Sequence, residues 1–243
     1  PIPIVKMTQP LIIDDRIVDG TSRRKLGIKE DDHVFLFNFD FMSVFERKNP
    51  LGLVKAFEQA FGQDDRALLI LHHINSGFNP HAANMLKEAS EKINAKIIER
   101  HLSDREYLSL VAACDCYVSL HRSEGLGLTM AEAMYLGKPV IATAYSGNMD
   151  FMNVNNSLLV KYDLVELDRD YGPYEKGNVW AEPDVKHAAE LMRWVYENRE
   201  RATRMGEKAA KDIRELMNPM TASREIRARL ERIHSEPNFR RHH

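Results

Sequence analysis

The sequence predicts an α/β fold: a Rossmann-like, doubly wound parallel sheet of about six strands, followed by trailing C-terminal helices. Three observations predict it. Short apolar runs, typical of strands covered on both faces, alternate with helical patterns between residues 34 and 160. Signals for helix starts and stops separate these segments. Beyond residue 160 the alternation ceases, and helical patterns occupy about 185–197, 199–216 and 221–234.

Each expected strand is a short apolar run, and the six runs are 34–39, 67–71, 96–98, 116–120, 140–142 and 157–160. Strands that alternate with helices form parallel sheets through right-handed crossovers. Six such strands suit the spatial order 3-2-1-4-5-6. The long polar stretch 161–184, rich in Tyr and Gly, is expected to be a loop excursion.

The helices between these strands carry end signals. Asn49 followed by Pro50 supplies an N-cap and a proline at the first helical position, and Gly62 can end that helix. Further helices are expected to start at Asn79–Pro80, at the capping box of Ser103 and Glu106, and at Thr129.

Composition narrows the class of protein. The chain is 44% hydrophobic and 29% charged, as in globular domains, and its net charge of −2 provides no whole-molecule attraction to nucleic acid. No apolar stretch approaches the roughly 20 residues of a membrane span, and no signal peptide is visible. Cys114 and Cys116 are expected to be buried thiols rather than a disulfide or a zinc site. The basic run 23–25 is expected to be a solvated loop. We therefore expect a cytoplasmic protein, and peripheral attachment at the inner membrane face stays open.

The expected topology also locates a ligand site. Doubly wound sheets bind ligands at the carboxyl ends of their strands, where the strand order reverses, which here lies between the first and fourth strands. The loops 40–49 and 121–129 emerge there. In the second loop, Gly125 and Gly127 let the backbone approach a ligand closely, and the helix behind them presents unpaired N–H groups to an anion.

Two carboxylates flank this anion site. Glu124 and Glu132 stand eight residues apart. Carboxylates accept hydrogen bonds from sugar hydroxyls while backbone N–H groups bind phosphates, so a nucleotide sugar suits the combination. Two other interpretations stay open at this point: Thr129 and Glu132 also have the spacing of a capping box, and Glu124 also fits a solvated loop charge.

The segment 124–134, continued by 138–143, resembles the Glu-x(7)-Glu signature of retaining glycosyltransferases of family four, which have the GT-B fold. The similarity extends over about 34–216. It implies that Glu124 contacts hydroxyls of the donor sugar and that Glu132 binds the ribose. It further implies a diphosphate and sugar facing the backbone of Gly125, Leu126, Gly127, Leu128 and Thr129.

The same resemblance implies ligand-binding roles for residues in the neighbouring loops. Lys48 and Arg47 precede the first helix, where such enzymes place cations on the diphosphate. Many relatives have an arginine nearer the strand, where this chain has Met42 and Ser43. Ser146 and Gly147 are expected to form a turn near the donor sugar, and Asp150 is an open candidate for an acidic partner there. Arg100 and His101, which follow the third strand, are expected to contact the base.

The implied reaction transfers a hexose-type sugar from a nucleoside diphosphate to an acceptor hydroxyl with retention, and the leaving phosphate acts as the base. No metal or cofactor is expected, since Lys48, Arg47 and the helix N-terminus could neutralise the diphosphate and no His/Cys cluster with metal spacing is present. Alternatives are a GT-B-like phosphorylase or sugar-nucleotide epimerase, and a nucleotide-sugar-binding module without catalysis.

The resemblance also divides the chain. Residues 1–33 are expected to be a lead-in or interdomain linker, 34–217 the Rossmann-like nucleotide-sugar-binding domain, and 218–243 a C-terminal helix and tail. The missing partner would be an N-terminal GT-B domain of about 150–200 residues, and the acceptor a glycan or a lipid-linked glycan.

Overall fold

A computed structural model describes residues 6–14, 16, 18, 22–62 and 66–235. Its six-stranded sheet has the order β3-β2-β1-β4-β5-β6, and every neighbouring pair is parallel. This confirms the predicted doubly wound sheet. The strands are β1 (His33–Asp40), β2 (Ala67–Ile74), β3 (Ala95–Glu99), β4 (Cys116–Ser119), β5 (Val140–Thr143) and β6 (Leu158–Val160).

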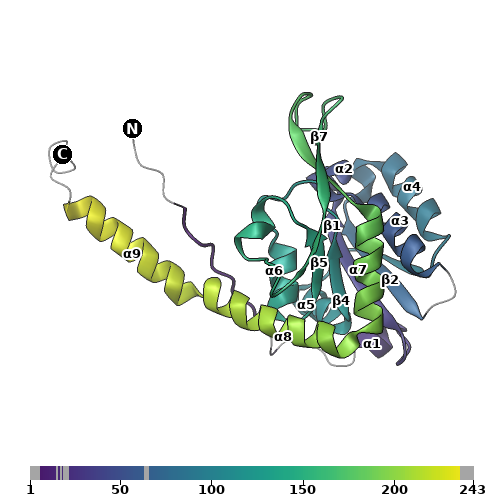
Figure 1. The fold of residues 1–243 in the computed structure, drawn as a ribbon, viewed down its shortest axis with the longest axis horizontal. Coiled ribbons are helices and arrows are strands. Elements are labelled where there is room, and N and C mark those ends of the chain that lie inside the picture. Colours follow the sequence, from purple (N-terminus) through teal and green to yellow (C-terminus); the bar gives the residue numbers. More distant parts are fainter. Residues whose placement is uncertain (1–5, 15, 17, 19–21, 63–65, 236–243) are drawn as a thin grey trace.

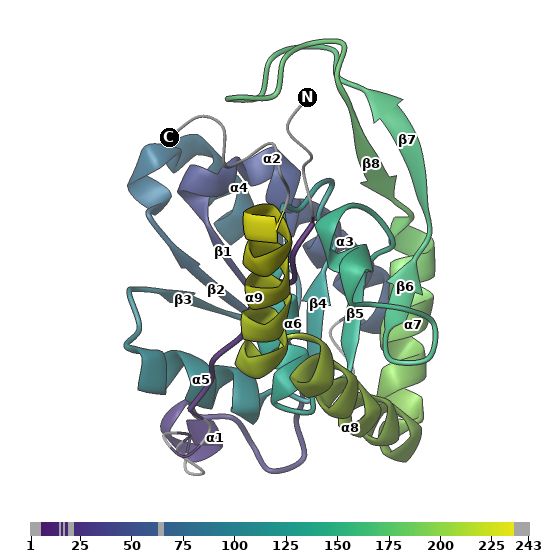
Figure 2. The ribbon, with the colours of Figure 1, turned by 90° about the vertical axis from the view of Figure 1, so that its left-hand side faces the viewer.

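Helices cover both faces of the sheet (Figures 1 and 2). One layer holds α3 (Pro50–Phe61), α4 (Pro80–Ser90) and α7 (Val185–Glu197), and the other holds α1 (Ser22–Lys25), α5 (Asp104–Ala113) and α6 (Leu128–Tyr135). Helix α8 (Arg199–Leu216) packs along α6, and α9 (Pro219–Ser235) extends away from the sheet. Short elements are α2 (Phe45–Lys48) and the 3-10 turns Phe41–Ser43, Ser76–Phe78 and Gly147–Asp150.

The helix ends follow the local signals in most places. The Asn49 side chain accepts a hydrogen bond from the Gly52 backbone, and both hydrogen bonds of the Ser103–Glu106 capping box are present. Helix α6 differs, because it begins at Leu128 and has no side-chain cap. The expected start at Thr129 is therefore one residue late, and the alternative capping box at Thr129 does not form.

The core lies between the sheet and its two helical layers. The side chains of β1 are buried almost throughout, as expected for a central strand with both faces covered. Cys114 and Cys116 are free and buried, which confirms the expectation of core thiols. Burial raises the pKa of the Cys114 thiol to about 12, so the thiol stays protonated and unreactive.

Two segments differ from the sequence expectation. The stretch expected as a loop excursion contains the antiparallel hairpin of β7 (Tyr162–Glu166) and β8 (Val179–Pro183), which projects beyond the sheet (Figure 1). The basic run expected to be a solvated loop forms α1, because the Arg23 guanidinium donates to the Asp115 carboxylate at 3.0 Å and to the Asp32 carbonyl at 2.6 Å. These partners lie 92 and 9 residues away, so composition alone did not indicate them.

Of the expected lead-in and tail, residues 1–5, 15, 17, 19–21 and 236–243 lie outside the described residues. The described part of the lead-in runs along the C-terminal helices, where the Leu11 N–H donates to the Met217 carbonyl at 2.9 Å. Among the described residues, no helix is both long enough and apolar enough to cross a bilayer.

Candidate functional site

The carboxyl ends of β1 and β4 bring the two expected loops together, and the backbone there is unusual. Val44, which follows β1, has φ 64° and ψ 106°, and Ser146, which follows β5, has φ 71° and ψ −143°. Asn49 adopts the left-handed conformation at φ 53°. Conformations of the Val44 and Ser146 kind cost about 1–3 kcal/mol each and persist only where surrounding contacts hold them. Such strain at one edge of the sheet indicates a functional site.

A compact cluster of charges occupies this edge. The Lys48 ammonium forms a direct ion pair with Glu124 Oε1, and Arg47 Nη1 lies 3.5 Å from Glu124 Oε2. The three side chains are 14%, 11% and 11% exposed, so water screens their charges only weakly. The guanidinium of Arg47 is also held by the carbonyls of Ser43 and Ser123 at 2.9 and 2.7 Å. The structure thus joins all three residues that the sequence nominated for the chemistry.

The pKa shifts of the pair reflect burial and attraction together. Burial acts to raise the pKa of Glu124, but the Lys48 ammonium and Arg47 outweigh it and lower the pKa of this carboxyl below its ordinary range. Burial lowers the pKa of Lys48, and the attraction of Glu124 offsets only part of that effect. We conclude that Glu124 is ionised at neutral pH, which makes it an acceptor of hydrogen bonds and not a proton donor.

Next to the charge cluster, the backbone approaches the N-terminus of α6 closely. Gly127 caps the helix at φ 88°. A Cβ at Gly147 would collide with the Gly125 carbonyl, so the chain passes here only because Gly147 lacks a side chain. The Ser146 hydroxyl accepts from the Glu124 N–H at 2.7 Å, and the Gly147 N–H donates to the Glu124 carbonyl at 3.1 Å. These bonds join the loop after β5 to the loop after β4 beside the positive end of the helix.

Glu132 lies in the second turn of α6, with a partner that the sequence did not indicate. The Tyr107 hydroxyl, from α5, donates to Glu132 Oε2 at 2.6 Å. Burial raises the pKa of Glu132, and the hydrogen bond from Tyr107 partly reverses that effect. This bond orients the carboxylate and leaves its other oxygen, Oε1, to accept from a ligand. In the sequence, Tyr107 follows the capping box of Ser103 and Glu106 on the same helix, and its spacing carries no signal of this role.

A buried histidine, His121, makes hydrogen bonds that fix the turn after β5. His121 is 0% exposed, and its Nε2 lies 3.1 Å from the Tyr145 carbonyl and 3.2 Å from Asn148 Oδ1. Both oxygens only accept, so Nε2 carries the proton, and Nδ1 accepts from the Ser119 hydroxyl at 3.0 Å. Burial lowers the pKa of His121, which keeps the ring neutral. The Asn148 amide also donates to Thr143, so this network locks the turn at residues 146–148.

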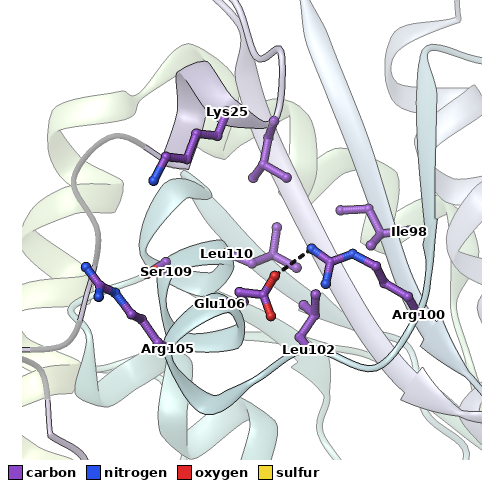
Figure 3. Close-up of a pocket in the computed structure, with 9 residues that line it drawn as sticks. Lys25, Ile98, Arg100, Leu102, Arg105, Glu106, Ser109 and Leu110 are labelled. Atoms are coloured by element: carbon purple, nitrogen blue, oxygen red, sulfur yellow. Dashed lines mark hydrogen bonds and ion pairs between the residues drawn. The ribbon is translucent and has the colours of Figure 1, made fainter.

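The structure places the Arg100 side chain beside α5. The Arg100 guanidinium binds Glu106 at 2.8 Å, and both side chains line a pocket of about 430 Å³ between α1 and α5 (Figure 3). Tyr107, the partner of Glu132, does not line this pocket. His101 is exposed.

Asp150 is also directed elsewhere. Its carboxylate pairs with the Lys6 ammonium at 2.5 Å, and the two side chains are 42% and 72% exposed. The open candidate for an acidic partner in the turn is therefore a surface ion pair in this structure. Among the described residues, no three His, Cys, Asp or Glu side chains gather in a way that could hold a metal ion.

The residues of this site lie within a segment that matches a known family. The family model described as glycosyl transferases group 1 matches residues 18–212, which is most of the chain. The chain belongs to the group 1 glycosyl transferases. The edge of the sheet described above is therefore the candidate substrate site of a glycosyltransferase domain. A comparison with curated proteins finds no significant match.

Solved structures agree with this fold. HepE from Anabaena, solved in complex with UDP and glucose, is 18% identical with a TM-score of 0.69 over 90% of this chain and 55% of its own. Sucrose-phosphate synthase from Thermosynechococcus elongatus is 18% identical, with a TM-score of 0.67 over 90% and 50%. A glycosyltransferase from Rickettsia africae is 16% identical, with a TM-score of 0.66 over 93% and 53%. The chain thus spans about half the length of these proteins.

Proposed function

We propose that this group 1 glycosyl transferase domain binds a nucleoside diphosphate sugar and contributes the donor half of a transfer that retains the anomeric configuration. One observation carries the proposal: two partly buried carboxylates lie near the start of α6, Glu124 before the helix and Glu132 in its second turn, and Glu124 is paired with Lys48 and Arg47. A diphosphate suits the cations and the helix end, and hydroxyls at each end of the ligand suit the carboxylates. That HepE was solved with UDP and glucose supports this choice of ligand.

In the proposed complex, Lys48 and Arg47 bind the diphosphate. A phosphate at the α6 N-terminus competes with Glu124 for the Lys48 ammonium, which frees the carboxylate for hydroxyls of the donor sugar. Glu132 Oε1 accepts from the ribose. As the bond to the anomeric carbon breaks, the same cations and the amides near Leu128 and Thr129 stabilise the charge that develops on the leaving phosphate.

Retention follows if the leaving phosphate oxygen takes the proton of the acceptor hydroxyl on the face from which it departs. Glu124 then orients the sugar and forms no covalent bond with it. We propose that these cations suffice without a metal ion. The remaining half of the active site would come from a second, N-terminal domain of the GT-B type, which would bind a glycan or lipid-linked glycan acceptor.

Isothermal titration calorimetry with UDP, GDP, dTDP and ADP sugars tests the donor site on the chain itself. Glu132→Ala should weaken binding of the bare nucleotide, because it removes the ribose acceptor. Glu124→Ala should leave the nucleotide bound but reduce discrimination between sugars. Glu197→Ala, an exposed carboxylate on α7, is the matched control and should change neither.

If neither site variant differs from the control with the best donor, the site assignment is wrong. With the partner domain supplied, analysis of products separates the alternatives. A glycoside with the donor configuration supports retaining transfer, whereas an epimerised nucleotide sugar, or binding with no product, contradicts it.

A further inference from the structure

The short helix α2, which carries Arg47 and Lys48, depends on contacts from outside itself. It has only four residues, begins after Val44 at φ 64° and ends at Asn49 in the left-handed conformation. A single helical turn is unstable alone, because it orders several residues for one hydrogen bond. Its last carbonyls also have no partners within the helix. Other parts of the chain must therefore fix α2, and with it the two cations.

Arg122, in the loop after β4, supplies contacts of this kind. Its backbone N–H donates to the Arg47 carbonyl at 2.8 Å, and its guanidinium Nη1 donates to the Glu46 carbonyl at 2.6 Å. Arginine side chains commonly bind the last carbonyls of a helix, where a positive charge is also favoured by the helix dipole. One residue therefore binds two carbonyls of α2.

The β7–β8 hairpin fixes Arg122 in turn. The Glu182 carboxylate accepts from its Nε at 2.6 Å and from its Nη2 at 2.9 Å, and the Trp180 ring lies 5.4 Å from the guanidinium. The Ala181 N–H of β8 donates to the Arg122 carbonyl at 2.9 Å. A bidentate pair fixes the direction of a guanidinium as well as its place. The Arg122 side chain, which is 19% exposed, therefore bridges β8 and α2.

These contacts end at the charge cluster of the candidate site. Glu124, two residues after Arg122, pairs with the Lys48 ammonium at the end of α2. Arg47 has further support, because the carbonyls of Ser43 and Ser123 hold its guanidinium. A shift of α2 would therefore act first on the contact between Lys48 and Glu124.

We propose that Arg122, held by Glu182, is a positioning residue that keeps Lys48 in register with Glu124 and thereby sets the affinity for a nucleoside diphosphate. The effect on the nucleotide rests on the proposed function, whereas the register of Lys48 does not. The geometry of the guanidinium matters here more than its charge. Arg122→Lys keeps the charge, but a single nitrogen cannot reproduce two bonds to Glu182 and one to the Glu46 carbonyl.

The titration of Glu124 measures the register without any ligand. Lys48, Arg47 and His121 are the charged or titratable groups that act on this carboxyl, and the two cations lower its pKa. If α2 shifts, Lys48 moves away and the pKa of Glu124 rises. ¹³C NMR of labelled glutamate carboxyls between pH 7 and 4 follows this group, and its signal is assigned with Glu124→Gln.

Three variants separate geometry from charge. Arg122→Lys should raise the pKa of Glu124. Glu182→Gln should raise it less, because it leaves Arg122 bonded to α2. Arg169→Lys is the matched control on the hairpin, since the Arg169 guanidinium lies over the Tyr171 ring at 4.9 Å, and it should change nothing.

Calorimetry with the tightest binder among UDP, GDP, dTDP and ADP measures the effect on the nucleotide. Arg122→Lys should weaken binding about fivefold, as expected for the loss of hydrogen bonds that hold a binding group in place. In the Lys48→Met background the same change should cost less than about twofold, because the group through which Arg122 acts is gone. Arg169→Lys should bind as the unaltered chain does.

Each part of the proposal has its own refutation. An unchanged pKa of Glu124 in Arg122→Lys overturns the positioning role. A raised pKa with undiminished nucleotide affinity overturns the effect on the donor. Equal losses in the two backgrounds overturn the route through Lys48. If none of the four nucleotides binds the unaltered chain, the proposed function fails, and the titration of Glu124 still decides the positioning role.

Discussion

The contact between Tyr107 and Glu132 yields the sharpest prediction. Tyr107→Phe removes one hydroxyl and keeps the ring, so the packing of α5 against the core is preserved. A hydrogen bond to a charged group contributes about 1.5–3 kcal/mol. In the variant, the Glu132 carboxylate is no longer held in one orientation before UDP binds, so part of this energy no longer contributes to the binding free energy. We expect UDP affinity to fall about tenfold at neutral pH, equivalent to about 1.4 kcal/mol.

The variant should also change the pH dependence of binding. Burial and the Asp104 carboxylate raise the pKa of Glu132, and the Tyr107 hydrogen bond lowers it. The phenol of Tyr117 also lies close enough to interact with Glu132, but its pKa is raised by burial and it stays neutral. Without the Tyr107 hydroxyl, the carboxyl becomes protonated at a higher pH. Since an ionised carboxylate accepts more strongly from ribose hydroxyls than a protonated one does, the loss of affinity should grow as the pH falls.

Calorimetric titration with UDP at pH 8, 7 and 6 measures both effects. Tyr135→Phe is the matched control, because Tyr135 lies on the same helix as Glu132 but its ring contacts the Arg214 guanidinium at 4.5 Å. The control should bind as the unaltered chain does. Equal affinities for Tyr107→Phe and the control across this pH range would refute the role of the hydrogen bond.

Three further predictions address charge, close packing and protonation. Lys48→Met should weaken UDP binding at least tenfold by calorimetry, and unchanged affinity would exclude a role on the diphosphate. Gly147→Ala places a methyl group against the Gly125 carbonyl and should lower the unfolding free energy by about 1–3 kcal/mol in denaturant titrations, whereas Gly77→Ala, with no atom within 4 Å, should not. Burial lowers the pKa of His33 from 6.5 to about 4, so protons bind the unfolded chain more readily in this range. Stability should therefore be fully present above pH 6.5 and fall by up to about 3 kcal/mol towards pH 4, and His33→Phe should flatten that slope.

Local patterns were enough to predict the sheet. Each strand and helix carries its own periodicity and end signals, as at Asn49 and Pro50 and at the capping box of Ser103 and Glu106. Right-handed crossovers then leave few ways to arrange six parallel strands. The hairpin of β7 and β8 was missed because its strands are joined by a twelve-residue connection, 167–178, instead of a tight turn.

The glutamate pair could be nominated from sequence, because a glycine-rich loop before a helix has a recognisable local form. The partners of the two glutamates could not be predicted from the sequence. Lys48 and Glu124 lie 76 residues apart, and Tyr107 and Glu132 lie 25 apart on different helices. Arg122, which joins the hairpin to α2, carried no pattern at all.

The sequence by itself determined which segments are strands and helices, the order of the sheet and the loop that faces its carboxyl edge, since these depend on interactions between near neighbours and on the handedness of the chain. Only the tertiary structure decided that Glu124 is ionised between two cations, that Glu132 is oriented by a phenol and that the hairpin contacts α2 through Arg122. Each of these depends on side chains from separate helices and loops that meet in the folded chain, partly out of water. Their charge states and orientations therefore depend on distances that no local pattern encodes.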